Sequence, residues 1–307
     1  MYHSQNKNVD NTHSGYVTHH SEYLPLKEVF MKSAEHAYIS VEQVRDQWNN
    51  LNYLSQPNYA NALEEYDGLV NIIRDSGAKI YNFPVDEEVN IDSIYCRDAS
   101  IATDFGMIIC RMGKSERLHE PIAQRRVFEA HKIPILGEIQ APGTLEGGDV
   151  TWLDENTLAV GHTYRTNHEG IRQLKNLLEP KGIEVVVAEL PHYKGSQDVF
   201  HLMSILSPVD KDLAVVYSPL MPIQFRNDLK DRGFLFVEVP EDEFESMGCN
   251  VLALAPRKCI MLEGNPKTRD AIITAGGVVT TYKGNEISSK GGGGPTCLTR
   301  PMKRTLL

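Results

Sequence analysis

The chain has 307 residues, enough for one large domain or two ordinary ones. Hydrophobic residues make up 41% and charged residues 23%, which excludes disorder as its main character. Lys and Arg number 31 against 41 Asp and Glu, a net charge of −10, which argues against a nucleic-acid or acidic-membrane surface. No apolar run approaches 18 residues, so we expect no membrane-spanning helix.

The N-terminal sequence MYHSQNKNVDNTHS is polar and lacks the apolar centre of a secretory signal. We therefore expect residues 1–14 to be a disordered tail and residues 15–307 to form a single domain. The five cysteines are odd in number and form no C-x-x-C pair, which argues against a disulfide framework or a zinc site. Free thiols in a reducing cytoplasm fit this pattern.

A helix followed by a break and a β-branched or apolar strand recurs along the chain. The repeats cover residues 63–84, 121–139, 168–190, 222–240 and 267–282. Their first halves carry apolar residues at the i, i+3 and i+4 spacing of an amphipathic helix. Four of these helices are followed by glycines that we expect to adopt the left-handed conformation of a C-cap: Gly77, Gly182, Gly233 and Gly277.

Paired apolar runs that flank turn residues lie between these repeats and predict β-hairpins. They cover residues 100–111, 149–161, 203–218 and 250–264, with turns expected at 104–106, 154–156, 208–210 and 255–257.

The spacing of the breaks predicts a repeat architecture. From Gly77 through residues 132, 182, 233 and 277, the steps are 55, 50, 51 and 44 residues. A period near 50 is typical of units that bury their apolar faces against each other. A doubly wound α/β sheet is the alternative, but it alternates helices with single strands and not with hairpins. We predict an α/β fold in which five strand–hairpin–helix units close into a five-bladed propeller.

Residues whose side chains are suited to catalysis or binding occur at the same place in each unit, just before the hairpin. They are Asp98, Glu146, His201, Asn250 and Cys297, separated by 48, 55, 49 and 47 residues. Each alone has an ordinary structural explanation, such as a hydrogen-bonded core histidine, a buried thiol or a turn capped by its own acid. Their shared register instead predicts that they meet in one central cavity.

This set of side chains suits nucleophilic chemistry on a cation. A thiolate at Cys297 is a strong nucleophile, His201 can move a proton, and Glu146 can orient the imidazole. Asp98 and the nearby Asp92 would raise the pKa of the thiol, which makes sense if a bound cation offsets their charge. A planar cation held by paired carboxylates suggests a guanidinium.

Three further features have both a structural and a functional interpretation. The glycines of 291–294 could form a flexible linker, or could bring the backbone close to a ligand and deliver Cys297 to the cavity. Arg117 and Arg165 could be solvated surface residues, or could form a fork for a substrate carboxylate. Residues 33–60 could form a lid over the cavity.

At these residues the sequence resembles the guanidino-modifying superfamily, which includes the dimethylarginine dimethylaminohydrolases, the arginine deiminases and the amidinotransferases. The resemblance covers residues 15–303, closest to the first of these groups. It is carried by D-S-I-Y-C-R-D (92–98), R-M-G…R…E (111–120), L-E-G-G-D-V (145–150), Y-R-T-N (164–167), H-L-M-S (201–204) and G-G-G-P-T-C-L-T (292–299).

The resemblance implies roles for individual residues and the five-bladed fold. Cys297 would be the nucleophile, His201 the general acid and base, and Glu146 its partner. Asp98 and Asp92 would hold the guanidinium. The remaining substrate-binding residues that we expect are Arg117 and Arg165 at the α-carboxylate, together with Arg97 and Asn250.

Two positions depart from individual members of the superfamily. Arginine deiminases have H-x-D, whereas this chain has Met203 at the position of that Asp. Dimethylaminohydrolases have Glu before the Asp, whereas this chain has Arg97, as deiminases and amidinotransferases do. The identity of the guanidino substrate is therefore open at this point.

The resemblance implies a hydrolase that converts arginine or N-methylated arginine to citrulline through a thiouronium on Cys297. The alternatives are an amidinotransferase, in which an amine replaces water, and a propeller that binds a partner without chemistry. We expect no metal and no organic cofactor. The expected partner is a small cationic guanidino amino acid, and self-association into a homo-oligomer is compatible with the sequence.

Overall fold

The computed structural model describes residues 17–305, so the tail expected over 1–14 lies outside the described residues. It contains five three-stranded sheets. In spatial order their strands are β15 (Arg300–Arg304), β1 (Leu26–Met31) and β2 (Lys79–Asn82); β3 (Ser100–Thr103), β4 (Gly106–Ile109) and β5 (Ile135–Glu138); β6 (Val150–Trp152), β7 (Thr157–His162) and β8 (Glu184–Glu189); β9 (Leu206–Asp210), β10 (Leu213–Val216) and β11 (Leu235–Glu238); β12 (Val251–Ala255), β13 (Lys258–Leu262) and β14 (Val278–Tyr282).

Every sheet is built on the same plan. The middle strand pairs antiparallel with one neighbour and parallel with the other, and a helix connects the two parallel strands. Those helices are α3 (Tyr59–Asp75), α4 (Glu120–Ala130), α5 (His168–Leu178), α6 (Ile223–Asp231) and α8 (Pro266–Thr274). The predicted helix in each unit is confirmed, and the antiparallel–parallel mixture excludes a doubly wound sheet.

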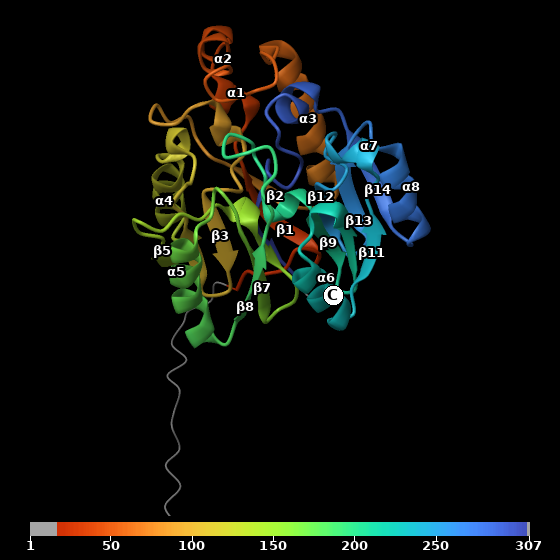
Figure 1. Cartoon of the computed structure of the whole chain (residues 1–307). Coiled ribbons are helices and arrows are strands. Elements are labelled where there is room, and N and C mark those ends of the chain that lie inside the picture. The colour runs from red at the N-terminus through yellow and green to blue at the C-terminus, as the bar shows by residue number, and fades with distance from the viewer. Residues whose placement is uncertain (1–16, 306–307) are drawn as a thin grey trace, which may run out of the picture.

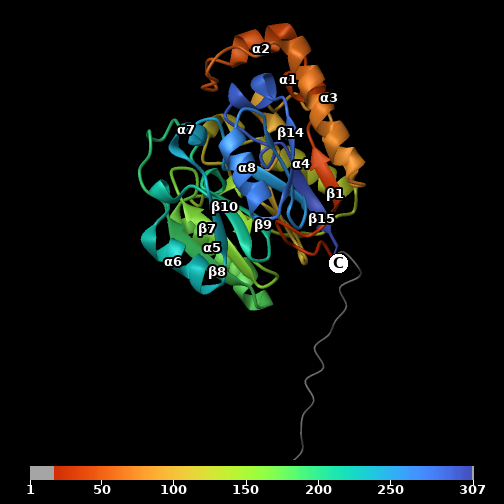
Figure 2. The same cartoon turned by 90° about the vertical axis from the view of Figure 1, so that its right-hand side faces the viewer.

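The five sheets form a ring with the five helices on its outside (Figure 1). Neighbouring sheets contact each other through the strand pairs β1 and β12, β12 and β9, β9 and β6, and β15 and β3. The ring closes because the last strand, β15, pairs with β1 from the other end of the chain (Figure 2). The fold is therefore the predicted five-bladed α/β propeller. The sequence analysis missed β1 and β15.

Two local predictions were wrong. The third hairpin turns at residues 211–212 and not at 208–210, because β9 continues through Pro208 to Asp210. Proline is tolerated there since β9 is an edge strand. The last helix has its left-handed glycine at Gly276 (φ 86°), whereas a Cβ on Gly277 would lie 2.6 Å from the Ile272 side chain. Gly77, Gly182 and Gly233 adopt positive φ angles as predicted.

The segment predicted as a candidate lid forms two short helices, α1 (Ala34–Tyr38) and α2 (Val41–Gln47), at one end of the molecule (Figures 1 and 2). Serine side chains cap both helices at their N-termini. A last short helix, α7 (Glu241–Phe244), precedes β12. Within residues 17–305, no helix combines the length and apolar character needed to cross a membrane.

Candidate active site

A cavity of about 210 Å³ is lined by residues from all parts of the ring. Seven of the residues singled out from the sequence line it: Asp92, Asp98, Arg117, Arg165, His201, Asn250 and Cys297. Leu51, Asn52 and Leu54 contribute from the segment after α2, so part of the candidate lid does border the cavity. Residues separated by up to two hundred positions therefore face one space, as the shared register predicted.

His201, which lines this cavity, forms a buried pair with Glu146, which does not line it. Glu146 is fully buried, and its Oε2 accepts a hydrogen bond from His201 Nε2 at 2.8 Å. Its Oε1 accepts from the backbone amides of Gly113 and Lys114 at 2.9 and 3.1 Å. Burial opposes charge on His201, but Asp149, Asp98 and Glu146 outweigh it and raise the pKa of the imidazole to about 9. His201 is therefore an imidazolium at neutral pH.

The Cys297 thiol is presented by the glycine-rich loop before it. Asn250 Nδ2 lies 3.4 Å from Sγ, and the Asn250 Oδ1 accepts from the Thr296 backbone and hydroxyl at 3.1 and 2.9 Å. A Cβ on Gly294 would lie 2.5 Å from Asn250, and one on Gly293 would lie 2.3 Å from Tyr95. Glycine is needed here so that the backbone can pass these side chains, which supports the delivery role over a linker.

The acidity of the thiol is set mainly by its burial. Burial raises the pKa of Cys297, and the Asp98 carboxylate raises it further, while hydrogen bonds from Thr296 and Asn250 lower it. The thiol is therefore protonated at neutral pH until a positive charge reaches Asp98.

Asp98 stands opposite His201 with one oxygen held and one free. Arg117 Nη1 donates to Asp98 Oδ2 at 2.6 Å, whereas Oδ1 is buried and has no hydrogen-bond partner among residues 17–305. A Cβ on Gly148 would lie 2.7 Å from that Oδ1 and 2.4 Å from His201 Nδ1, so glycine is required between the two side chains. A buried carboxylate oxygen without a donor is costly, and a donor from a ligand would offset that cost.

The protein itself occupies more of the Arg117 donors than a fork for a substrate carboxylate would allow. Its Nε and Nη2 donate to the two oxygens of Glu120 at 2.8 and 2.7 Å, and Nη2 also donates to the Tyr95 carbonyl at 2.9 Å. With Nη1 on Asp98, most of its donors are occupied. Arg117 therefore positions Asp98. Burial raises the pKa of Glu120 to about 7 despite this arginine.

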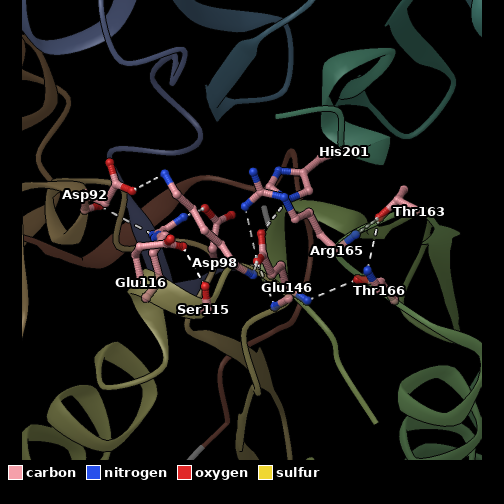
Figure 3. Close-up of polar contacts among 12 residues, drawn as sticks. Asp92, Asp98, Ser115, Glu116, Glu146, Thr163, Arg165, Thr166 and His201 are labelled. Carbon is pink, nitrogen blue, oxygen red and sulfur yellow. Dashed lines mark hydrogen bonds and ion pairs between the residues drawn. The ribbon is translucent and has the colours of Figure 1, made fainter. Parts of the chain in front are cut away.

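Arg165 and Asp92 lie on either side of this centre (Figure 3). Arg165 is buried, its Nη1 lies 3.6 Å from Glu146 Oε1, and it points toward His201. Asp92 is paired with Lys114, whose Nζ donates to Oδ2 at 2.6 Å. Asp92 therefore lines the cavity as one partner of an ion pair with Lys114.

The expectation that Arg97 binds substrate is wrong in this structure. Arg97 is buried away from the cavity, and its Nη2 donates to both oxygens of Glu22 at 2.7 Å. The Glu22 carboxylate explains this, because it gives the buried guanidinium of Arg97 a counter-charge away from the cavity.

Sequence reasoning missed three residues of the site: Lys114, Glu120 and Asp149. Asp149 accepts from the Thr163 and Thr166 hydroxyls at 2.7 and 2.6 Å and from the Leu202 amide at 3.0 Å. It thereby joins the Arg165 loop to the His201 turn. Burial raises its pKa to about 6. Its place in L-E-G-G-D-V was the signal that could have identified it.

Two groups within the described chain bring histidine and carboxylate atoms within 4.8 Å of one another, as a metal site requires. One is Asp98, Glu146 and His201, and the other is His162, His168 and Glu189 on the surface. In the first group the Glu146 oxygens already accept from His201 and two amides. That group fits proton transfer.

Comparison with known proteins assigns the family. Residues 36–304 match the family model described as "N,N dimethylarginine dimethylhydrolase, eukaryotic". The chain belongs to this family. It is 28% identical over 247 residues to the N(G),N(G)-dimethylarginine dimethylaminohydrolase of Pseudomonas aeruginosa, covering 80% of this chain and 91% of that protein. It is 27% identical to the arginine deiminase of Mycoplasma capricolum, but it spans only 65% of that protein's length.

Solved structures agree with this assignment. A dimethylarginine dimethylaminohydrolase in adduct with S-methyl-L-thiocitrulline superposes with a TM-score of 0.73 at 25% identity, covering 91% of this chain and 100% of that one. An amidinotransferase from Microseira wollei reaches a TM-score of 0.79 at 16% identity, covering 95% and 98%, and shows that the fold is shared. The chain is a hydrolase that acts on a carbon–nitrogen bond of a linear amidine, as the sequence analysis expected.

Proposed function

We propose that this hydrolase converts an N-methylated arginine to citrulline and a methylated amine, with Cys297 as nucleophile and His201 as acid and base. One observation carries the proposal. Asp98 lines the same cavity as Cys297 and His201, and its Oδ1 is buried without a partner among residues 17–305. A guanidinium N–H would satisfy that oxygen and place the central carbon between thiol and imidazole.

The substrate itself activates the thiol. Because burial and Asp98 raise the pKa of Cys297, the free enzyme holds a protonated thiol. A bound guanidinium offsets the charge of Asp98 and adds a positive charge beside the sulfur, which lowers the pKa of the thiol. Deprotonation is thus coupled to binding of the correct cation, and the nucleophile is kept unreactive toward neutral electrophiles.

The reaction then follows in two stages. The thiolate attacks the guanidinium carbon and forms a tetrahedral intermediate, and His201 gives its proton to the departing methylamine or dimethylamine. A thiouronium remains on Cys297, and the now neutral His201 removes a proton from water as the water attacks. Collapse releases citrulline and the thiol. Glu146 keeps the imidazole in place and stabilises its charged form.

Two cavity residues support a methylated amino acid as the substrate. Met203 lines the cavity at the position where arginine deiminases carry an acid, and its thioether can contact N-methyl groups. Arg165 is the cavity arginine whose guanidinium is not occupied by a close hydrogen bond, at 3.6 Å from its nearest acid among the described residues. It is suited to the α-carboxylate of the substrate.

The test is a substrate panel with citrulline or another ureido product as readout. Arginine, monomethylarginine, dimethylarginine, agmatine and guanidinoacetate are assayed with and without glycine or lysine as acceptor. We expect turnover of the methylated arginines without acceptor and loss of activity in Cys297→Ser, with Cys259→Ser as a buried thiol control. Full turnover by Cys297→Ser would refute the mechanism. Product that requires an added amine would indicate the amidinotransferase.

A covalent label separates an enzyme from a propeller that only binds. We expect 2-chloroacetamidine to modify Cys297 in the folded protein and not in a denatured control. Labelling that is equal in both states would favour the binding-only alternative.

The proposal extends to the chain as a whole. Residues 15–307 act as one catalytic domain in the cytoplasm, where the five free thiols of the structure would persist. Neither a metal nor an organic cofactor has a step in the mechanism. The ligand is a single small guanidino amino acid.

A further inference from the structure

Three buried arginines lie near the strand that closes the ring, and none lines the cavity described above. Arg97, Arg300 and Arg304 are exposed by 1%, 5% and 1%. We call them the buried arginine cluster. Arg300 and Arg304 lie on the closing strand β15, and Arg300 Nη1 lies 3.4 Å from the Arg97 carbonyl. The mechanism uses none of the three.

Negative charge does not balance this cluster. Within residues 17–305, the ion pair between Arg97 and Glu22 is the one salt bridge that any member makes. Three guanidiniums thus share one carboxylate. A charge buried without a counter-charge costs several kcal/mol or more. Burial accordingly lowers the pKa of Arg300 to about 9 and that of Arg304 to about 10, values at which both remain charged near neutral pH.

The donors of the cluster point to a missing acceptor. Arg304 uses Nη1 on the carbonyls of Leu24 and Ala253, but its Nε and Nη2 are buried with no partner among the described residues. Arg97 uses Nη2 on Glu22, and its Nε and Nη1 are likewise without a partner in that part of the chain. Four buried guanidinium nitrogens without acceptors, from two residues, are unusual in a folded protein.

A small, partly open cavity lies beside two members of the cluster, Arg300 and Arg304. It has a volume of about 10 Å³ and is also lined by Glu22 and Lys303. Thr18, His20 and Trp152 complete this part of its lining. A space of this size holds about one water molecule or one ion of similar size.

We propose that a single halide-class anion, chloride under ordinary conditions, binds in this cavity against Arg304 and the rest of the buried arginine cluster. One negative charge would offset part of the excess of two positive charges and accept from the free Arg304 donors. Water could accept from the same donors but would leave the charge uncompensated. The charge excess is what favours an anion over water.

The position of the cluster gives the anion a structural consequence. β15 closes the ring against β1, and the Arg97 amide donates to the Cys297 carbonyl at 3.2 Å. The anion therefore ties the closing strand to the segments that carry Asp98 and Cys297. We expect binding to stabilise the folded ring and to raise its melting temperature with chloride concentration, as any ligand of the folded state does.

The test compares chloride with gluconate at equal ionic strength in the full-length protein. We expect the melting temperature of the wild type to rise steadily from 1 to 300 mM chloride and to stay level in gluconate. Arg304→Met should abolish the difference, and Arg232→Met, which removes a half-exposed arginine paired with Glu184, should retain it. Equal melting curves of the wild type in both salts would overturn the proposal.

Crystals of the wild type grown or soaked in bromide provide a second readout, which does not depend on whether Arg304→Met folds. An anomalous peak within hydrogen-bond distance of Arg304 Nε or Nη2 supports the anion site. Density for water alone, or for a carboxylate from residues 1–16 or 306–307, would contradict it.

Discussion

Glu146→Gln isolates the charge that keeps His201 protonated. Glutamine has the shape of glutamate, so its Oε1 can still accept from the amides of Gly113 and Lys114. Its amide nitrogen, however, faces His201 Nε2 as a donor and favours the neutral imidazole. The variant therefore changes the protonation of His201, while the backbone amides of Gly113 and Lys114 keep their hydrogen-bond acceptor.

The size of the effect follows from the pKa of about 9 for His201. Asp149 and Asp98 remain in the variant, so removing one adjacent carboxylate should lower the pKa of His201 by about 1 to 3 pH units. With a pKa near 7, about half of the imidazole is charged at pH 7 and about a tenth at pH 8. In the wild type about nine tenths is charged at pH 8. We expect kcat to fall about twofold at pH 7 and about tenfold at pH 8.

Two measurements check this expectation. The kcat for citrulline formation is followed from pH 5.5 to 9, and the pKa of His201 is measured by NMR on selectively labelled histidine, assigned with His201→Asn. Glu116→Gln is the matched control, since Glu116 is exposed and bonds only to Ser115 among the described side chains. A loss of activity in Glu146→Gln that is uniform across this range, with the pKa of His201 unchanged, would refute the reasoning.

Four further expectations follow from the contacts. Gly148→Ala pushes a methyl group against His201 and Asp98 and should cost at least about 100-fold in kcat with an unchanged circular dichroism spectrum. Gly68→Ala, a helical position with nothing within 4 Å of the new Cβ, should instead stabilise the protein by about 0.5–1 kcal/mol in urea unfolding. Arg165→Met should raise KM by about 10- to 100-fold and lower kcat far less. Folding raises the pKa of His201 from 6.5 to about 9, so the stability that its charge contributes is complete below pH 6.5 and is lost as pH rises through 9. His201→Asn lacks this contribution and should therefore lose less stability than the wild type between pH 6 and 9.5.

The architecture could be predicted because its signals are local and repeated. Each unit contains a helix with apolar residues at helical spacing and most contain two apolar runs around turn residues, so the period near 50 residues predicts a ring of repeated units. The closing strand carries no such signal. β15 reads Arg-Pro-Met-Lys-Arg, which is charged and contains proline, and its strand character comes from pairing with β1 across the whole chain. Long-range pairing of this kind overrides local propensity.

The register of the candidate site could be predicted, but the direction of individual side chains could not. His201 and Cys297 were found because their chemistry is specific. Arg97 and Arg117 were expected at the substrate from the resemblance to the guanidino-modifying superfamily. In the structure Arg97 pairs with Glu22, and Arg117 donates two hydrogen bonds to Glu120. Glu120 lies only three residues after Arg117, whereas Glu22 lies 75 positions from Arg97, and a single sequence holds no record of such a distant pairing.

The charge balance of the buried centre explains why one oxygen is left for the substrate. Lys114 neutralises Asp92, and Arg117 lies between Glu120 and Asp98. Across the centre, five carboxyl groups face four cationic groups, and Glu120, with a pKa of about 7, is only partly charged at neutral pH. The carboxyl groups are Asp92, Asp98, Glu120, Glu146 and Asp149, and the cations are Lys114, Arg117, Arg165 and the His201 imidazolium.

The missing positive charge is the one that a guanidinium brings, and it is missing at Asp98, beside the sulfur. A neutral urea such as citrulline supplies no such charge, so the product loses the interaction that held the substrate. The same imbalance that raises the pKa of the Cys297 thiol before substrate binds therefore favours both activation by the substrate and release of the product.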